Sequence, residues 1–146
     1  MRIASGSMQE PGADEEHEGE SADEAAVRSV NRAFYDAFEA RDLDAMSDVW
    51  EHADRVSCTH PGWRTLRGWG AVSGSWFALF GGPSPLQFIL TNEVVSVAGD
   101  AAWVTVDENL ISAEGGGTVA AVNLFLRSGD RWRLVAHHGS AVVPQA

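Results

Sequence analysis

The feature that most constrains this fold is a series of four segments between Leu86 and Val143 in which apolar and polar residues alternate. They cover residues 86–98, 101–113, 117–128 and 131–143, and the short sequences "GD", "EGGG" and "SGD" lie between them. A period of two residues is typical of strands, and short connections rich in glycine and aspartate favour hairpin turns. The second half of the chain therefore predicts an antiparallel meander.

The first half follows a different period. Val27, Val30, Phe34 and Phe38 recur at helical spacing, and the sequence "SADE" at residues 21–24 fits a capping box. This helix should run to about Ala40. A second short helix is expected from Asp42, and a third after Gly68.

Between these helices, the sequence "RVSCTH" alternates so that Val56, Cys58 and His60 share one face of a short strand. Helices first and a meander afterwards predict an α+β domain.

The charge of the chain is concentrated at its start. The net charge is −11, but residues 1–24 hold eight of the 21 acidic groups and one arginine. The remaining 122 residues hold 13 acidic groups and nine arginines, which leaves a net charge of −4. A strongly charged segment poor in apolar residues cannot bury enough surface to order itself. We therefore expect residues 1–22 to be a disordered acidic tail and residues 23–146 to be a single domain.

Composition excludes several classes of function. The ten basic residues are all arginine, so Schiff-base chemistry and a phosphate-loop lysine are ruled out. No basic stripe favours nucleic acid, and no apolar run approaches the roughly 20 residues of a membrane span. The start of the chain lacks a signal-peptide core, and the single cysteine, Cys58, cannot form an internal disulfide. The expected location is the cytoplasm, with no membrane or nucleic-acid partner.

Four stretches of the chain resemble a known superfamily: "AFYDAFEARDLDAMSDVW", "THPGW…LRGW", "AWVTVDENL" and "RSGDRWRLVAHHGS". Together with the order of the elements, they are similar to the nuclear transport factor 2-like superfamily, in its SnoaL-like and ketosteroid-isomerase-like branch. The resemblance covers about residues 24–143. It implies a cone-shaped, cystatin-like domain whose N-terminal helices pack on the concave face of a curved, mainly antiparallel sheet. It also implies an apolar pocket within the cone and a homodimer formed through the outer sheet face.

The resemblance does not extend to the catalytic groups of the ketosteroid isomerases. Where those enzymes carry a basic aspartate, this chain has His60, and the position of their oxyanion tyrosine falls on Phe34, with Tyr35 about 100° around the helix. Their second aspartate falls among residues 119–121, which are Val-Ala-Ala here. Steroid isomerisation is therefore not implied, since fold does not determine function.

Two histidines are the candidate catalytic residues. His60 ends the inward-facing row of its strand, where a neutral imidazole can accept a proton near neutral pH; its alternative role is to cap the turn that follows. By strict alternation from Trp132, His138 shares the core face and His137 the opposite face. His138 is predicted to be a pocket residue, with a hydrogen-bonded core histidine as the equally supported alternative.

Four residues are candidates for binding a substrate. Trp63 and Trp76 could form flat aromatic walls, although tryptophans also serve as core residues. Glu108 shares its parity with apolar neighbours, so it is the candidate for a buried carboxylate. Asn123 could orient a ligand carbonyl or make a cross-strand hydrogen bond.

Three functions remain open on the sequence alone. The first is an enzyme performing acid–base isomerisation, cyclisation or hydration on a small, largely apolar or polycyclic organic compound, with no cofactor. The second is a non-catalytic ligand-binding protein, and the third is a dimeric association domain. No metal site is predicted, because His60, Glu108 and His138 are far apart in the sequence and show no local ligand spacing.

Overall fold

The four alternating segments form the long strands of one sheet. In this computed structural model, which describes residues 19–83, 85–112 and 115–144, the strands are β3 (Gln87–Ala98), β4 (Ala101–Ser112), β5 (Gly115–Ser128) and β6 (Arg131–Ala141). Two short strands, β1 (Ser57–Thr59) and β2 (Leu66–Arg67), extend the sheet. The order is β2-β1-β6-β5-β4-β3, and only the β1–β6 pairing is parallel.

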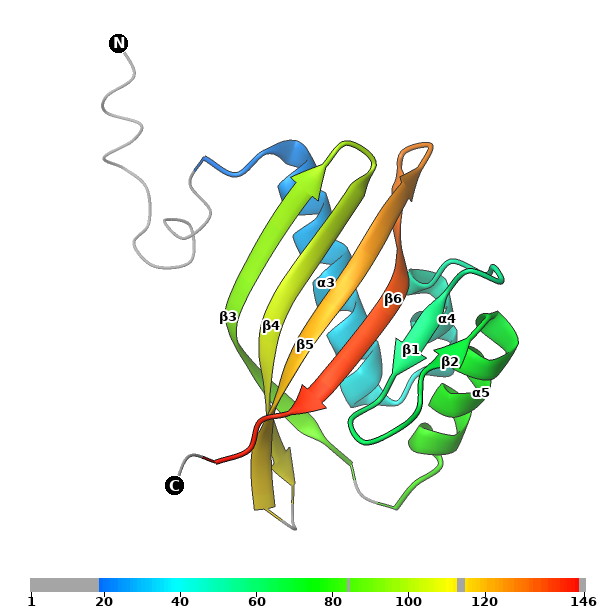
Figure 1. Ribbon diagram of the computed structural model, residues 1–146, viewed down its shortest axis with the longest axis vertical. Helices are drawn as coiled ribbons and strands as arrows, with labels where there is room; N and C mark the ends of the chain where they lie inside the picture. The colour runs from blue at the N-terminus through cyan, green and yellow to red at the C-terminus, as the bar shows by residue number, and fades with distance from the viewer. Residues whose placement is uncertain (1–18, 84, 113–114, 145–146) are drawn as a thin grey trace.

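The helices are α3 (Ala22–Ala40), α4 (Leu43–Val49) and α5 (Trp69–Phe80). Figure 1 shows the sheet curving around α3, with α4 and α5 beside β1 and β2 at one side. This arrangement confirms the predicted α+β cone. Among the residues described, none of the helices combines the length and apolar character needed to cross a membrane.

The helix ends follow from local sequence. The Ser21 side chain accepts a hydrogen bond from the Glu24 amide, and the Glu24 carboxylate accepts one from the Ser21 amide, which completes the predicted capping box. Arg41 ends α3 in a left-handed conformation with φ of 54°. Asp42 then caps α4 by accepting a hydrogen bond from the Ala45 amide.

The predicted tail lies mostly outside the described residues, because residues 1–18 are not among them. Glu20 is described, and it accepts a 2.9 Å hydrogen bond from Arg28 Nε. The packed part of the chain therefore includes Glu20, which the sequence analysis assigned to the tail.

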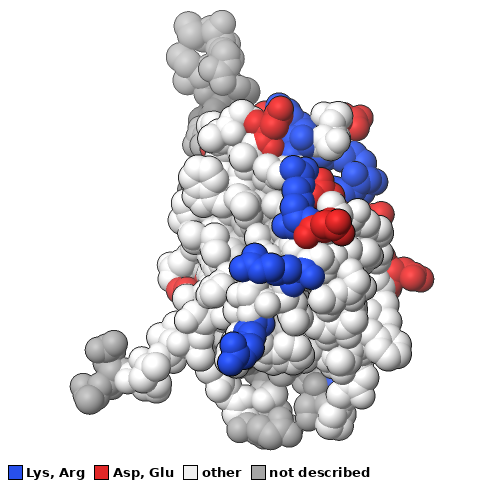
Figure 2. Space-filling model, turned by 45° about the vertical axis from the view of Figure 1, so that its right-hand side comes forward, with Lys and Arg blue, Asp and Glu red and all other residues white. Residues whose placement is uncertain are grey.

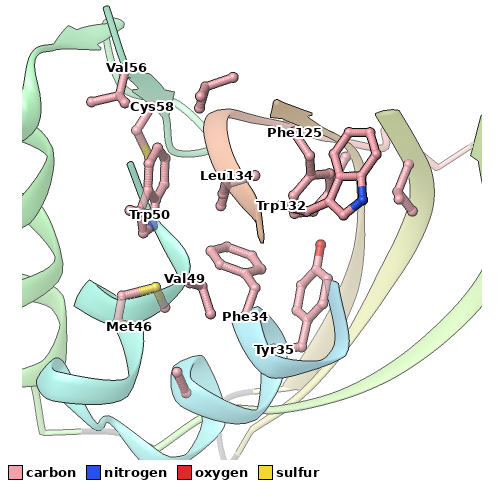
Figure 3. Close-up of a cluster of buried hydrophobic side chains, with 14 of the residues drawn as sticks. Phe34, Tyr35, Met46, Val49, Trp50, Val56, Cys58, Phe125, Trp132 and Leu134 are labelled. Carbon is pink, nitrogen blue, oxygen red and sulfur yellow. The ribbon is translucent and has the colours of Figure 1, made fainter. Parts of the chain in front are cut away.

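The core lies between α3 and the concave face of the sheet. Figure 3 shows Phe34 and Tyr35 rising from α3 toward the strands that carry Phe125 and Leu134, with Met46 and Trp50 beside them. Phe34 and Leu134 are completely buried. Burying an aromatic or leucine side chain stabilises a fold by about 1.5–3 kcal/mol, so this layer holds the helix against the sheet.

A β-bulge interrupts β6 in the middle of the core. Phe125 pairs with Leu134, but the preceding Leu124 pairs with Ala136, so Val135 is the extra residue. Leu134 and Val135 are consequently both buried, and the alternation of faces is shifted by one residue from there on. This shift decides which of the two adjacent histidines faces inward.

Candidate functional site

A cavity of about 260 Å³ opens between the C-terminal ends of α3 and α5 and the concave face of the sheet. Its lining is mainly apolar and aromatic, which suits a small organic ligand. Four polar side chains, from four different elements or loops, also border it. The lining consists of Phe38, Arg41, His60, Pro61, Trp63, Leu79, Phe80, Leu86, Phe88, Glu108, Leu110, Val119 and His137.

Glu108 brings a carboxyl group from β4 into this apolar lining. Its Oε2 accepts a 2.5 Å hydrogen bond from the Tyr35 hydroxyl, and the residue is only 3% exposed. Burial raises the pKa of Glu108 to about 7, although the hydrogen bond from Tyr35 opposes the shift. At neutral pH, Glu108 is therefore present in both its protonated and its ionised form, as a general acid or base requires.

The pKa of the Tyr35 hydroxyl is raised as well. Burial is the main cause, and the charge of Glu108 adds to it. Tyr35 therefore stays protonated and keeps donating to Glu108. This holds Oε2 of the carboxyl group, and Oε1 has no hydrogen bond among the described residues.

His137 is held by a chain of amide groups that starts at the surface. Arg28 forms an ion pair with Glu93. The Glu93 carboxylate also accepts a 2.8 Å hydrogen bond from Asn31 Nδ2. Asn31 Oδ1 in turn accepts a 2.9 Å hydrogen bond from Asn123 Nδ2. Asn123 Oδ1 lies 2.6 Å from His137 Nδ1. Because the Glu93 carboxylate can only accept, the direction of every hydrogen bond in the chain is determined.

It follows that His137 Nδ1 carries the proton and donates to Asn123. The other ring nitrogen, Nε2, is then unprotonated and free to act as an acceptor or a base. Burial, with smaller contributions from His60 and His138, lowers the pKa of His137 to about 3. The ring is therefore neutral across the physiological pH range.

His60 follows the inward row of β1, as predicted, and is buried. Its Nε2 lies 2.9 Å from the Ser75 hydroxyl, which donates its own proton to the Val72 carbonyl. The hydroxyl must therefore accept from His60, so Nε2 carries the proton and Nδ1 does not. Burial lowers the pKa of His60 to about 4. The two imidazole rings are 6.4 Å apart between centroids.

The predicted inward position of His138 is wrong. His138 is exposed on the outer sheet face opposite Val122, and His137 is 2% exposed and borders the cavity. The cause is the bulge at Val135, because strict alternation from Trp132 does not survive an extra residue. The structure therefore brings His60 and His137, rather than His60 and His138, to one cavity.

The four predicted binding residues divide into two groups. Trp63, which is 43% exposed, and Glu108 both line the cavity. Trp76 and Asn123 do not: Trp76 is buried behind His60 with its ring 4.8 Å away, and Asn123 lies behind Glu108 and His137. Trp76 is therefore a core residue and not a wall, and Asn123 orients side chains.

Several residues of the site were not predicted from the sequence. Tyr35 was set aside as lying off the inward face of its helix, yet Asn31 and Tyr35 are spaced by four residues and are both buried. That polar pair on a helix with a wide apolar face was the available signal. Nothing local marked Ser75 or Arg41 as part of the site. Among the described residues, no group of three His, Cys, Asp or Glu side chains is arranged to hold a metal ion.

The arrangement provides a base and an acid on one apolar cavity. The neutral ring of His137 offers a hydrogen-bond acceptor at Nε2, and protonated Glu108 offers a donor. In an apolar setting, charges that develop during a proton transfer interact more strongly than they do in water.

Comparison with known proteins assigns the fold to an established family. The family model described as SnoaL-like domain matches residues 27–144. A solved structure from Streptomyces avermitilis, named a "putative dehydratase from the NTF2-like family", is 40% identical, with a TM-score of 0.77 over 84% of this chain and 97% of that one. A "putative calcium/calmodulin-dependent protein kinase type II association domain" from Thiobacillus denitrificans is 37% identical, with a TM-score of 0.69 over 80% of this chain and 94% of that one.

A plant protein shares the domain as well. The F-box protein SKIP8 of Arabidopsis thaliana is 30% identical over 118 residues, which are 81% of this chain and 50% of the plant protein. The chain thus spans about half the length of this curated relative.

Proposed function

The chain belongs to the SnoaL-like domain family, and we propose that it is an enzyme that moves protons on a small, largely apolar organic compound. The reaction we favour is the reversible removal of water from a β-hydroxy carbonyl compound. One observation carries this proposal: His137, whose Nε2 is unprotonated, and Glu108, whose carboxyl group is titratable, line the same apolar cavity.

The steps balance without a cofactor. His137 Nε2 removes the proton next to the carbonyl, and the C–H electron pair forms the new double bond as the C–O bond to the hydroxyl breaks. Protonated Glu108 gives its proton to the leaving oxygen, so that water departs. The imidazolium and the carboxylate then exchange the proton through water, which restores both groups.

The other residues have supporting roles in this proposal. Asn123 keeps the proton on His137 Nδ1, and Tyr35 holds one oxygen of Glu108. His60 lies on the same cavity with its unprotonated Nδ1 4.0 Å from Cys58 Sγ, and Trp63 stands at the exposed rim. The name of the Streptomyces avermitilis relative agrees with this class of reaction, although it describes that protein only.

The test is a dehydration assay in deuterated water. The aldol adduct of benzaldehyde and acetone is a β-hydroxy ketone that turns into benzylideneacetone, whose absorbance is easily followed. We expect enone formation and deuterium incorporation next to the carbonyl. Both should be lost in Glu108→Gln and His137→Gln and retained in His138→Gln. If the wild-type protein produces neither signal with this adduct and its alkyl analogues, the proposal is wrong.

A second candidate function is an association domain, and the outer sheet face favours it. Large apolar side chains are exposed there, including Trp103, Val122 and Leu124. Figure 2 shows that charged side chains gather in a band, whereas a broad part of the same view carries no charge. A homodimer through this face is compatible with either function. A tight dimer with no turnover and no ligand would favour the association domain.

A further inference from the structure

Arg41 is a lining residue of the cavity that the proposed reaction does not use. It follows α3, and its side chain reaches the end of α5, where Nη1 donates to the Gly82 carbonyl at 2.8 Å and the Phe80 carbonyl at 3.4 Å. These contacts tie the two helix ends together. They also place a guanidinium group at the edge of the cavity.

The second terminal nitrogen of Arg41 has no such partner. Nη2 is buried, and no hydrogen-bond acceptor lies within reach of it among the described residues. Arg41 is also absent from the ion pairs that the described residues form. A buried N–H group of a cation without an acceptor is unfavourable, and a ligand that supplied an acceptor would remove that cost.

The surroundings of Arg41 restrict what such a ligand can be. Phe38, Leu79, Phe80 and Leu86 form the neighbouring lining and offer only apolar side chains. Apart from the two histidines and the Glu108 carboxyl group, Arg41 is the only polar side chain of the described lining. A ligand oxygen near this edge therefore lies close to the Arg41 guanidinium group. Glu108 is the one acidic side chain of the described lining.

We propose that the ligand is a small carboxylic acid whose carboxylate binds Arg41 and whose apolar body extends toward His60, His137 and Glu108. A planar carboxylate matches the planar fork of donors on a guanidinium group better than other common organic groups do. Nη2 is buried in the ligand-free molecule, so the side chains that cover it must move apart for a carboxylate to reach it while Nη1 keeps its two carbonyl acceptors. This inference rests on the proposed small-molecule function of the cavity.

The structural role of Arg41 does not account for the whole side chain. Capping the carbonyls at the end of α5 uses Nη1, and a lysine could satisfy the same acceptors. This capping role leaves Nη2 in an apolar setting without a hydrogen-bond acceptor among the described residues. A ligand carboxylate would use that remaining donor.

The experiment compares hydrocinnamate with hydrocinnamamide, which has the same shape but no charge, by titration calorimetry at neutral pH. Wild-type protein should bind the carboxylate roughly tenfold to a hundredfold more tightly than the amide, as expected for a charge-assisted pair. Arg41→Met should lose this preference while still binding the amide. Arg64→Met removes an exposed arginine next to Trp63 and should keep the preference. Should Arg41→Met be too unstable to purify, Arg41→Lys replaces it and should show a several-fold smaller preference.

The outcomes distinguish the role of Arg41 from the small-molecule function of the cavity. If both probes bind equally well, or if Arg41→Met keeps the preference, the role of Arg41 is refuted and the cavity remains a binding site. If neither probe binds to the wild-type protein, the assignment of the cavity to small aromatic ligands fails, and the role of Arg41 fails with it.

Discussion

The buried carboxyl group of Glu108 should make the stability of the fold depend on pH in a defined direction. Its pKa is about 7 in the folded protein against an ordinary value of 4.5. Between these two values the folded state binds more protons than the unfolded state, so the free energy of unfolding falls as pH rises. The contribution is greatest below pH 4.5 and is lost by the time pH has passed about 7.

The magnitude follows from the size of the shift. Each pKa unit corresponds to about 1.4 kcal/mol, so a shift from 4.5 to about 7 amounts to about 3 kcal/mol. His60 and His137 act in the opposite direction, because their lowered pKa values destabilise the fold as pH falls below 6.5. The profile of the wild-type protein alone is therefore a sum of opposing terms.

A matched variant isolates the carboxyl group. Glu108→Gln keeps the shape and can still accept from Tyr35, but it cannot ionise. The difference in free energy of unfolding between Glu108→Gln and wild type, measured by urea denaturation, should move by about 2.5 kcal/mol in favour of the variant between pH 5 and pH 8. The histidine terms largely cancel in this difference.

A second variant tests the cause. Tyr35→Phe removes the hydrogen bond that holds the pKa of Glu108 down, so the loss of stability should shift to higher pH. If the difference between Glu108→Gln and wild type stays within about 1 kcal/mol across the range, Glu108 is not buried as described, and the reasoning fails.

Three further outcomes are expected. His137→Gln should abolish enone formation and His138→Gln should leave it nearly unchanged, because only His137 borders the cavity; equal losses in both variants would contradict this. Trp76→Ala should lower the free energy of unfolding by about 3–5 kcal/mol in urea denaturation, because Trp76 is buried. Trp63→Ala should lower it by about 1 kcal/mol or less and should mainly weaken hydrocinnamate binding, because Trp63 is 43% exposed. Leu124→Asp should yield a monomer in sedimentation velocity while the wild-type protein is a dimer; a wild-type monomer at micromolar concentration would exclude the proposed interface.

Regular periodicity made most of the fold predictable. The helices at Ala22–Ala40 and Trp69–Phe80 and the four long strands each repeat their pattern often enough to identify the element. β2 has only Leu66 and Arg67, which is too short for any period to be detected. No pattern in the sequence therefore predicts β2.

The site was less predictable because its geometry depends on departures from regular structure. The inward position of His60 was predictable, since Val56 and Cys58 lead to it by uninterrupted alternation. His137 was missed because the bulge at Val135 depends on how β5 and β6 pair, which no local pattern in β6 reveals. Arg41 points to the cavity because its own backbone is left-handed and α5 ends beside it, a relation between distant segments.

Gly139 restricts which histidine can occupy the cavity. It faces inward two residues after His137, and a Cβ atom there would lie 3.0 Å from Val119 Cγ1 and 3.3 Å from Pro61 Cγ. If β6 slipped by one residue, His138 would turn inward and Ser140 would take the place of Gly139, pushing against both neighbours. The absence of a side chain at residue 139 thus helps to set the register of β6, and this register places His137 rather than His138 at the cavity.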